Sequence, residues 1–126
     1  MSKPKPKTVY IIDDDELFTD CIELAVHKAN KNLEIKKFKN AIVAMDELND
    51  NLPDLIFLDI LLPGADGFTF LNELTSYPDT AEIPVVMITS LNLPKTDLSI
   101  YGVRGILNKE TMKPEEVIDY VHRLVK

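Results

Sequence analysis

Five short apolar runs alternate with segments of helical periodicity along almost the whole chain. The runs occupy residues 8–12, 33–38, 55–58, 84–88 and 105–108. Most of them are continuous rather than alternating, which is typical of strands covered on both faces. Strands of this kind, each followed by a helix, form a parallel sheet through right-handed crossovers. We therefore predict an α/β fold, a doubly wound five-stranded parallel sheet with helices on both faces.

The segments between the runs carry recognisable helix signals. Residues 15–30 repeat apolar side chains at helical spacing, and Cys21 within this stripe is expected to be buried. Asn40 is a candidate N-cap for a second helix with the apolar residues Ile42, Val43, Met45 and Leu48. After a turn at 63–67, the third helix is expected to bury Phe68, Leu71 and Leu74. Further helices are predicted near Pro94 and from Pro114, a residue type suited to a first helical position.

Length and charge limit the classes of function. A chain of 126 residues accommodates one domain, and we predict a flexible Lys/Pro tail over 1–7 and the domain over 8–126. The net charge of −7 argues against nucleic-acid binding, which needs a basic surface. The sequence contains neither an apolar span of membrane length nor a signal peptide, so we expect no membrane partner and a cytoplasmic location. The single cysteine excludes an internal disulfide.

Polar residues follow four of the predicted strands at the point where each ends. Asp13 and Asp14 follow the first, Asp59 the third, Thr89 the fourth and Lys109 the fifth. The carboxyl ends of parallel strands meet at one edge of an open sheet, where such folds bind ligands. We therefore expect these five side chains to lie together.

The residue types at this edge indicate a particular chemistry. Three carboxylates repel one another unless a cation lies among them, and one lysine cannot neutralise all three. A hard divalent cation with oxygen ligands can, and Mg²⁺ fits best because it binds few carboxylates and retains waters or phosphate oxygens. A carboxylate can also be a nucleophile that forms an aspartyl-phosphate, with Lys109 and Thr89 interacting with the phosphoryl oxygens.

With these motifs in place, the chain resembles the receiver domains of two-component response regulators, from about Val9 to Leu124. The resemblance rests on residues 11–15, on 53–64 with Asp66 and Gly67, on 85–90, and on Gly102, Gly105 and Lys109. It implies a flavodoxin-like sheet of order 2-1-3-4-5. It also implies a phosphorelay switch in which a histidine kinase or phosphotransfer protein phosphorylates the acceptor and an unknown downstream protein responds.

The same resemblance implies a role for each site residue. Asp59 would be the phosphoacceptor, and Thr89 and Lys109 would hold the phosphoryl oxygens. Mg²⁺ would be bound by Asp14 directly, by Asp13 through water, by Asp59, and by the backbone carbonyl of Leu61. Apart from this self-catalysed phosphotransfer and a slow self-dephosphorylation, no enzymatic activity is expected.

The sequence departs from the family pattern near the fifth strand. Ile106 stands where the family usually has an aromatic residue, and Glu110 follows Lys109 in place of a common proline. The interval from Thr89 to Lys109 is also short for the family, which affects the usual output route. Leu61 and Leu91 beside the site cannot orient an attacking water, so we predict slow loss of the phosphoryl group.

Other functions remain open at this point. A haloacid dehalogenase-like phosphatase would need a second acid in place of Leu61, and a flavodoxin-like electron carrier would need a phosphate-binding loop in place of residues 13–15. More serious alternatives are a receiver module cut from a larger regulator or hybrid kinase, and a receiver that binds proteins without phosphorylation. We expect a monomer or weak dimer.

Overall fold

The structure is a computed structural model that describes residues 6–60, 67–90 and 102–125. Several predictions concern residues outside these ranges. They are the tail up to residue 5, the turn at 63–66, the helix near Pro94, the metal ligand Leu61 and the apolar residue Leu91.

The five predicted strands form one all-parallel sheet of order β2-β1-β3-β4-β5, which confirms the predicted fold class and order. The strands are β1 (Thr8–Ile12), β2 (Glu34–Phe38), β3 (Leu55–Asp59), β4 (Val85–Thr89) and β5 (Val103–Asn108). The last strand begins two residues earlier than predicted, beside an irregularity in its register with β4.

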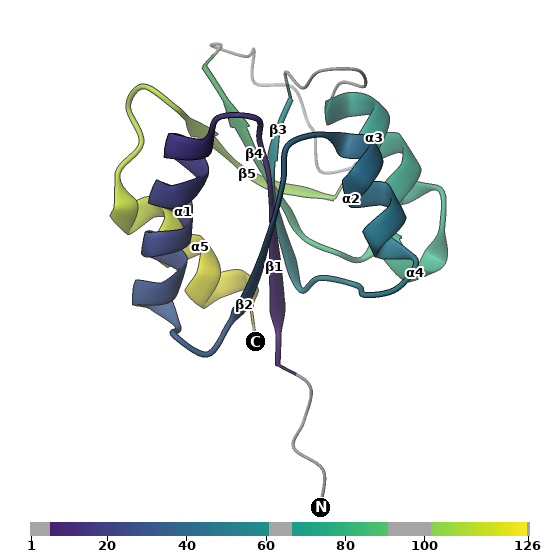
Figure 1. Cartoon of the computed structure of the whole chain (residues 1–126), viewed down its shortest axis with the longest axis horizontal. Coiled ribbons are helices and arrows are strands. Elements are labelled where there is room, and N and C mark those ends of the chain that lie inside the picture. The colour runs from purple at the N-terminus through teal and green to yellow at the C-terminus, as the bar shows by residue number, and fades with distance from the viewer. Residues whose placement is uncertain (1–5, 61–66, 91–101, 126) are drawn as a thin grey trace, which may run out of the picture.

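Helices cover both faces of the sheet, as Figure 1 shows. On one face lie α1 (Glu16–Ala29) and α5 (Pro114–Leu124), and on the other α2 (Ala41–Leu48), α3 (Gly67–Thr75) and α4 (Pro78–Ala81). The Asn40 side chain accepts a hydrogen bond from the backbone N–H of Val43 at 2.9 Å, which confirms the predicted N-cap of α2. Within the described ranges, no helix is long and apolar enough to cross a membrane.

The core consists of two apolar layers, one on each side of the sheet. All residues of β1, β3 and β4 are buried, as their continuous apolar sequences predict. Tyr10, Ile56 and Met87 face the layer beneath α2 and α3, and Val9, Phe57 and Ile88 face the layer beneath α1 and α5. The sheet is therefore held rigidly from both sides, and its carboxyl edge gains a fixed geometry.

The buried faces of three helices differ from the prediction. Cys21 is exposed on α1, and α2 buries Ala41 and Ala44 while Ile42 and Val43 are 60% and 51% exposed. Phe68 is likewise partly exposed on α3. Six of the eight residues of α2 are apolar, so periodicity alone cannot identify the buried face. The small alanine side chains face the sheet and let the helix approach it closely.

The edge strand β2 is tied to both helical layers by ion pairs. Lys37 Nζ contacts Asp20 at 2.9 Å and Glu23 at 3.0 Å, both on α1. The neighbouring Lys36 pairs with Glu47 on α2. Successive strand residues point to opposite faces, so these two lysines reach opposite sides of the sheet.

Candidate functional site

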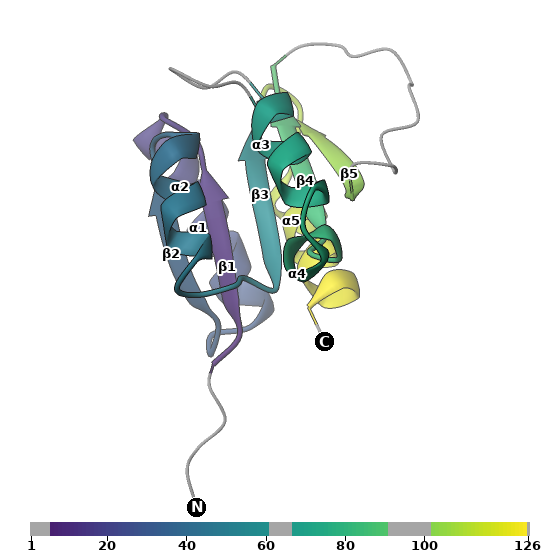
Figure 2. The same cartoon turned by 90° about the vertical axis from the view of Figure 1, so that its right-hand side faces the viewer.

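The predicted site residues meet at the carboxyl edge of the sheet. Asp59 and Thr89 are the last residues of β3 and β4, and Asp13 and Lys109 directly follow β1 and β5. Figure 2 shows the carboxyl ends of these parallel strands at the same edge. The structure thus brings together residues from four strands that are up to 96 positions apart in the sequence (109 − 13).

Lys109 connects two of the carboxylates. Its Nζ lies 2.8 Å from Oδ2 of Asp13 and donates a hydrogen bond of 3.1 Å to Oδ2 of Asp59. The side chains of Asp13 and Asp59 are 0% and 6% exposed, so this cation compensates charges that water reaches poorly.

Backbone contacts fix the position of Asp13. Its N–H donates to the carbonyl of Phe38 at the end of β2, and its Oδ1 accepts a hydrogen bond of 2.9 Å from the N–H of Asp15. Asp15 in turn caps α1 by accepting from the N–H of Phe18. The acidic run is therefore held by the start of the first helix, and Asp15 has the capping role expected of an acid at this position.

Burial and the charge of the oppositely charged partner shift the pKa values of Asp13 and Lys109 in opposite directions. The pKa of Asp13 is raised from 3.8 to about 6 in total: desolvation raises it most, the contact with Lys109 and the hydrogen bond from Asp15 lower it, and nearby Asp59 raises it. For Lys109, desolvation lowers the pKa, but Asp13 and Asp59 outweigh it, so the net direction is upward. The lysine is therefore a permanent cation at neutral pH.

The carboxylates have the geometry of a cation site. Asp13, Asp14 and Asp59 each offer an oxygen, and these oxygens all lie within 4.8 Å of one another. Asp13 Oδ2 is buried and contacts the charge of Lys109 without a hydrogen bond of acceptable geometry. A buried anionic oxygen with capacity to spare, beside the more exposed Asp14, suits a hard divalent cation that keeps part of its water shell. The predicted ligand Leu61 lies outside the described residues.

Two residues support the site in ways that sequence reasoning missed. The Phe18 ring lies beneath the Lys109 ammonium, with 4.9 Å from Nζ to the ring centroid. Gly67 lies against the end of β3, because a Cβ there would be 2.6 Å from Ile60 Cα and 3.0 Å from the carbonyl oxygen of Asp59. The signals were a phenylalanine in the first turn after the acidic run and a glycine in the turn after Asp59.

The buried hydroxyl of Thr89 completes this edge of the sheet. Thr89 is 1% exposed, and its carbonyl accepts the backbone N–H of Lys109 at 2.9 Å. This bond fixes where the lysine leaves β5. Lys109 and a cation held by the carboxylates can neutralise the charge of a phosphate group that approaches the edge, and the Thr89 hydroxyl can donate a hydrogen bond to it.

An all-parallel sheet of this order, with acidic residues and a lysine at its carboxyl edge, defines a ligand-binding α/β class. The chain belongs to the response regulator receiver domain family, whose model matches residues 9–122. This finding confirms the resemblance drawn from the sequence motifs.

Curated relatives are longer proteins. The response regulator PleD of Caulobacter vibrioides is 33% identical over 67% of this chain and 18% of its own length. The phosphate regulon regulator PhoB of Pseudomonas aeruginosa is 30% identical over 94% of this chain and 50% of its own length. The chain therefore spans half or less of the length of these two relatives.

Solved structures agree with the fold. A putative response regulator from Chloroflexus aurantiacus has a TM-score of 0.78 at 30% identity, covering 95% of this chain and 98% of its own. The chemotaxis response regulator CheY4 of Vibrio cholerae has a TM-score of 0.81 at 19% identity, covering 96% and 100%. The Mn²⁺-bound response regulator Rcp1 has a TM-score of 0.77 at 21% identity, covering 96% of each chain. At such identities the last two show the fold alone.

Proposed function

We propose that this receiver domain is a phosphoacceptor switch of a two-component phosphorelay. Asp59 accepts a phosphoryl group from a histidine kinase or phosphotransfer protein, and the new charge changes a protein-binding surface. The observation that carries the proposal is the hydrogen bond from Lys109 Nζ to Asp59 Oδ2, beside the cluster with Asp13 and Asp14. Family membership independently supports it.

The proposed chemistry uses the residues in distinct ways. A carboxylate oxygen of Asp59 attacks the phosphorus of a phosphohistidine, the P–N bond breaks, and the imidazole leaves with a proton. Lys109 and the Thr89 hydroxyl interact with the phosphoryl oxygens. Mg²⁺, held by Asp13, Asp14, Asp59 and the Leu61 carbonyl, would neutralise charge on the transferring group. Asp59→Asn removes the nucleophilic carboxylate and keeps the shape of the side chain.

An apolar stripe on α1 is the proposed contact for the phosphodonor. Leu17 and Leu24 are 80% and 65% exposed, and the exposed Cys21 lies between them at helical spacing. The stripe begins four residues after Asp13 and ends at the exposed Leu24. Exposed leucines at this spacing suit docking against another helix, which would bring a phosphohistidine to the neighbouring site.

The output surface is proposed to include Ile106. It is 43% exposed on β5, three residues before Lys109. A group this close to the phosphorylated edge can change its contacts when Lys109 is drawn to the phosphoryl oxygens, and an unknown downstream protein would read that change. The activated state would be a population shift between two conformations.

Residues 8–126 are proposed to act as a single receiver domain, cytoplasmic and monomeric or weakly dimeric. The longer relatives leave open a place within a larger regulator or hybrid kinase. The sensor histidine kinase CheAY of Helicobacter pylori, for example, is 30% identical over 99% of this chain and 16% of its own length. A second candidate function is protein binding without phosphorylation, which the exposed Leu17, Leu24 and Ile106 would equally serve.

The test is the intact mass after incubation with Mg²⁺ and acetyl phosphate. We expect one added phosphoryl group on the native chain and none on Asp59→Asn or without Mg²⁺. Beryllofluoride binding, measured in parallel, reports a competent site even where the small donor reacts slowly. Failure of both would contradict the switch and favour the phosphorylation-independent module.

A further inference from the structure

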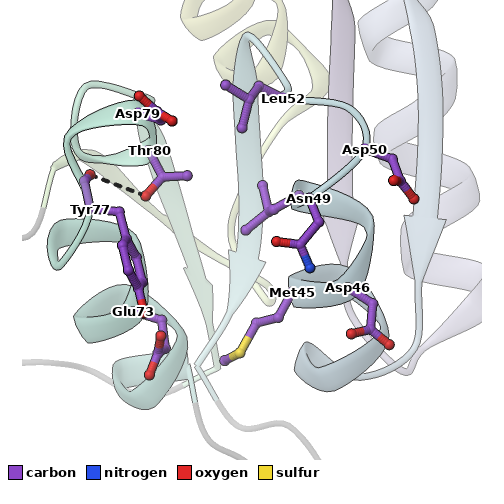
Figure 3. Close-up of a pocket in the computed structure, with 10 residues that line it drawn as sticks. Met45, Asp46, Asn49, Asp50, Leu52, Glu73, Tyr77, Asp79 and Thr80 are labelled. Carbon is purple, nitrogen blue, oxygen red and sulfur yellow. Dashed lines mark hydrogen bonds between the residues drawn. The ribbon is translucent and has the colours of Figure 1, made fainter.

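A second candidate site lies away from the carboxylate–lysine edge, in a pocket between the end of α2 and the segment from α3 to α4. Its volume is about 500 Å³. Figure 3 shows Met45 and Asn49 on the α2 side, and Glu73, Tyr77 and Thr80 on the opposite side. The pocket therefore has walls from separate helices, and the Asn49 amide lies on the α2 side.

The rim of this pocket is acidic. Asp46 and Asp50 lie on the α2 side, and Glu73 and Asp79 on the opposite side. Among the ion pairs between described residues, none involves these four carboxylates. Among the described residues that line the pocket there is no lysine or arginine. Its occupant should accordingly be cationic.

The pocket also has an apolar component. Tyr77 is 59% exposed and Leu52 is 48% exposed, and both line it together with Met45 and Leu48. An exposed tyrosine beside carboxylates suits an extended segment that alternates prolines, which pack on aromatic rings, with lysines. Such a segment needs no partner strand or helix, because the extended proline conformation is preformed.

The chain itself contains a segment with this chemistry. Residues 2–7 read Ser-Lys-Pro-Lys-Pro-Lys, with three lysines, two prolines and no acid. In the described part, Pro6 and Lys7 are exposed and lead directly into β1.

The start of β1 lies beside the rim of the pocket. The backbone N–H of Thr8 donates to Asp54 Oδ2 at 2.8 Å, and the N–H of Asp54 donates to the Thr8 carbonyl at 2.7 Å. Leu52 precedes Asp54 by two residues, or about 7 Å of extended chain at most. The Lys7 carbonyl accepts the N–H of Glu34 at 2.9 Å, so the free reach is that of residues 2–6, about 17 Å when extended, which is enough to enter the pocket from this side. In both Figure 1 and Figure 2, α4 lies toward the same edge of the sheet as the start of β1.

We propose that the Lys-Pro segment at residues 2–7 docks intramolecularly in this acidic pocket. Lys3 and Lys5 pair with the carboxylates of the rim, and a proline packs against the Tyr77 ring. The attraction depends on charge, and the tether raises the local concentration of the segment to about the millimolar range. The α2 and α3–α4 surface is then covered by the chain's own N-terminal segment.

The experiment uses nuclear magnetic resonance of the whole chain with a spin label on Ser2→Cys, in a Cys21→Ser background. Docking predicts stronger loss of amide intensity at Leu52, Tyr77 and Thr80 than at Asn30 and Asn32, which follow α1. The difference should shrink in about 0.5 M NaCl, where the Debye length is about 4 Å.

Charge variants separate docking from proximity. Lys3→Gln with Lys5→Gln should abolish the difference, and so should Asp50→Asn with Asp79→Asn. The matched control is Lys28→Gln with Lys31→Gln, which removes the same charge from an exposed region and should leave the difference intact.

Two outcomes would overturn the proposal. Equal intensity loss at the pocket and at Asn30 and Asn32 would mean that the segment does not dock. Intensity loss in a ¹⁵N-labelled chain mixed with a separate spin-labelled chain would mean that the occupant belongs to a second copy. Neither result depends on phosphorylation of Asp59.

Discussion

The ammonium nitrogen of Lys109 lies 2.8 Å from Oδ2 of Asp13, a carboxylate whose side chain has no exposed surface. The lysine also bonds to Asp59, so one cation serves two buried anions. A divalent cation at the same carboxylates would share this task with the lysine. Folding stability, metal binding and phosphoryl acceptance should therefore be coupled through this one side chain.

Replacing Lys109 by Met should destabilise the metal-free protein by about 2 kcal/mol at neutral pH, because Asp13 and Asp59 lose their shared cation. Urea unfolding in EDTA measures this, and added Mg²⁺ should recover part of the loss. Lys37→Met is the control. It removes a lysine that also contacts two acids, but at an exposed edge, and should cost less than about 1 kcal/mol. Equal losses would contradict the special role of the buried pair.

Asp13 should give the metal-free protein a distinctive pH dependence. The folded-state pKa of about 6 exceeds the ordinary 3.8, so the folded protein holds this proton more tightly than the unfolded chain. The contribution of Asp13 to the free energy of unfolding should therefore fall as pH rises from about 4 to about 6, by about 3 kcal/mol in total.

Asp13→Asn should lack this contribution. The measured quantity is the difference between wild type and variant in urea unfolding free energy across that pH range in EDTA, since other carboxylates add slopes common to both. A difference that is constant with pH would refute the raised pKa of Asp13. At pH 7.5 saturating Mg²⁺ should reverse the order of the two unfolding free energies found in EDTA and make the wild type more stable than Asp13→Asn. The reason is that only the wild type keeps the full set of anionic ligands.

Gly67→Ala should destabilise the fold by about 1–3 kcal/mol and reduce phosphorylation of Asp59, because the new methyl group meets the backbone of Ile60 and Asp59. Urea unfolding and intact mass give the two readouts. At Gly105 the obstacle is instead the Tyr120 side chain, which can rotate. Gly105→Ala should therefore destabilise the fold by less than Gly67→Ala does, and leave the phosphoryl adduct on Asp59 unchanged. In a Tyr120→Ala background its destabilising effect should be smaller still. Retained phosphorylation in Gly67→Ala would show that the close approach does not position Asp59.

Leu17→Ser with Leu24→Ser should slow transfer from a phosphorylated kinase or phosphotransfer protein by about tenfold, or about 1.4 kcal/mol. Labelling by acetyl phosphate should not change, since the small donor needs no helix contact. Stability should shift by less than about 0.5 kcal/mol, because both leucines are exposed. Ile42→Ser with Val43→Ser on α2 removes similar apolar surface elsewhere and serves as the control. A slower reaction with both donors would place the defect in the chemistry rather than in docking.

The strands and the edge where the site lies could be predicted because their signal is local. A continuous apolar run that ends in Asp59 or Thr89 fixes both the strand and the position of its polar terminus. Parallel pairing then brings such termini together whatever the sequence between them.

The helix orientations could not be predicted in the same way. In α2, Ile42 is apolar enough to be buried against the sheet. Ala41 and Ala44 face the sheet instead, because close packing favours small side chains there. The four-residue α4 escaped prediction because it has no buried residue and so no apolar periodicity. The contact of Phe18 with Lys109 joins residues 91 positions apart (109 − 18), which no local pattern encodes.

The paired lysines of β2 have a consequence for association between molecules. A strand at the border of a sheet offers unpaired peptide groups to any chain that arrives in extended form. Here an incoming strand would have to lie along Lys36 and Lys37, whose charges are fixed on both sides of the border by Glu47, Asp20 and Glu23. The ion pairs thus make this border a poor template for cross-β growth and favour solubility of the folded chain at high concentration.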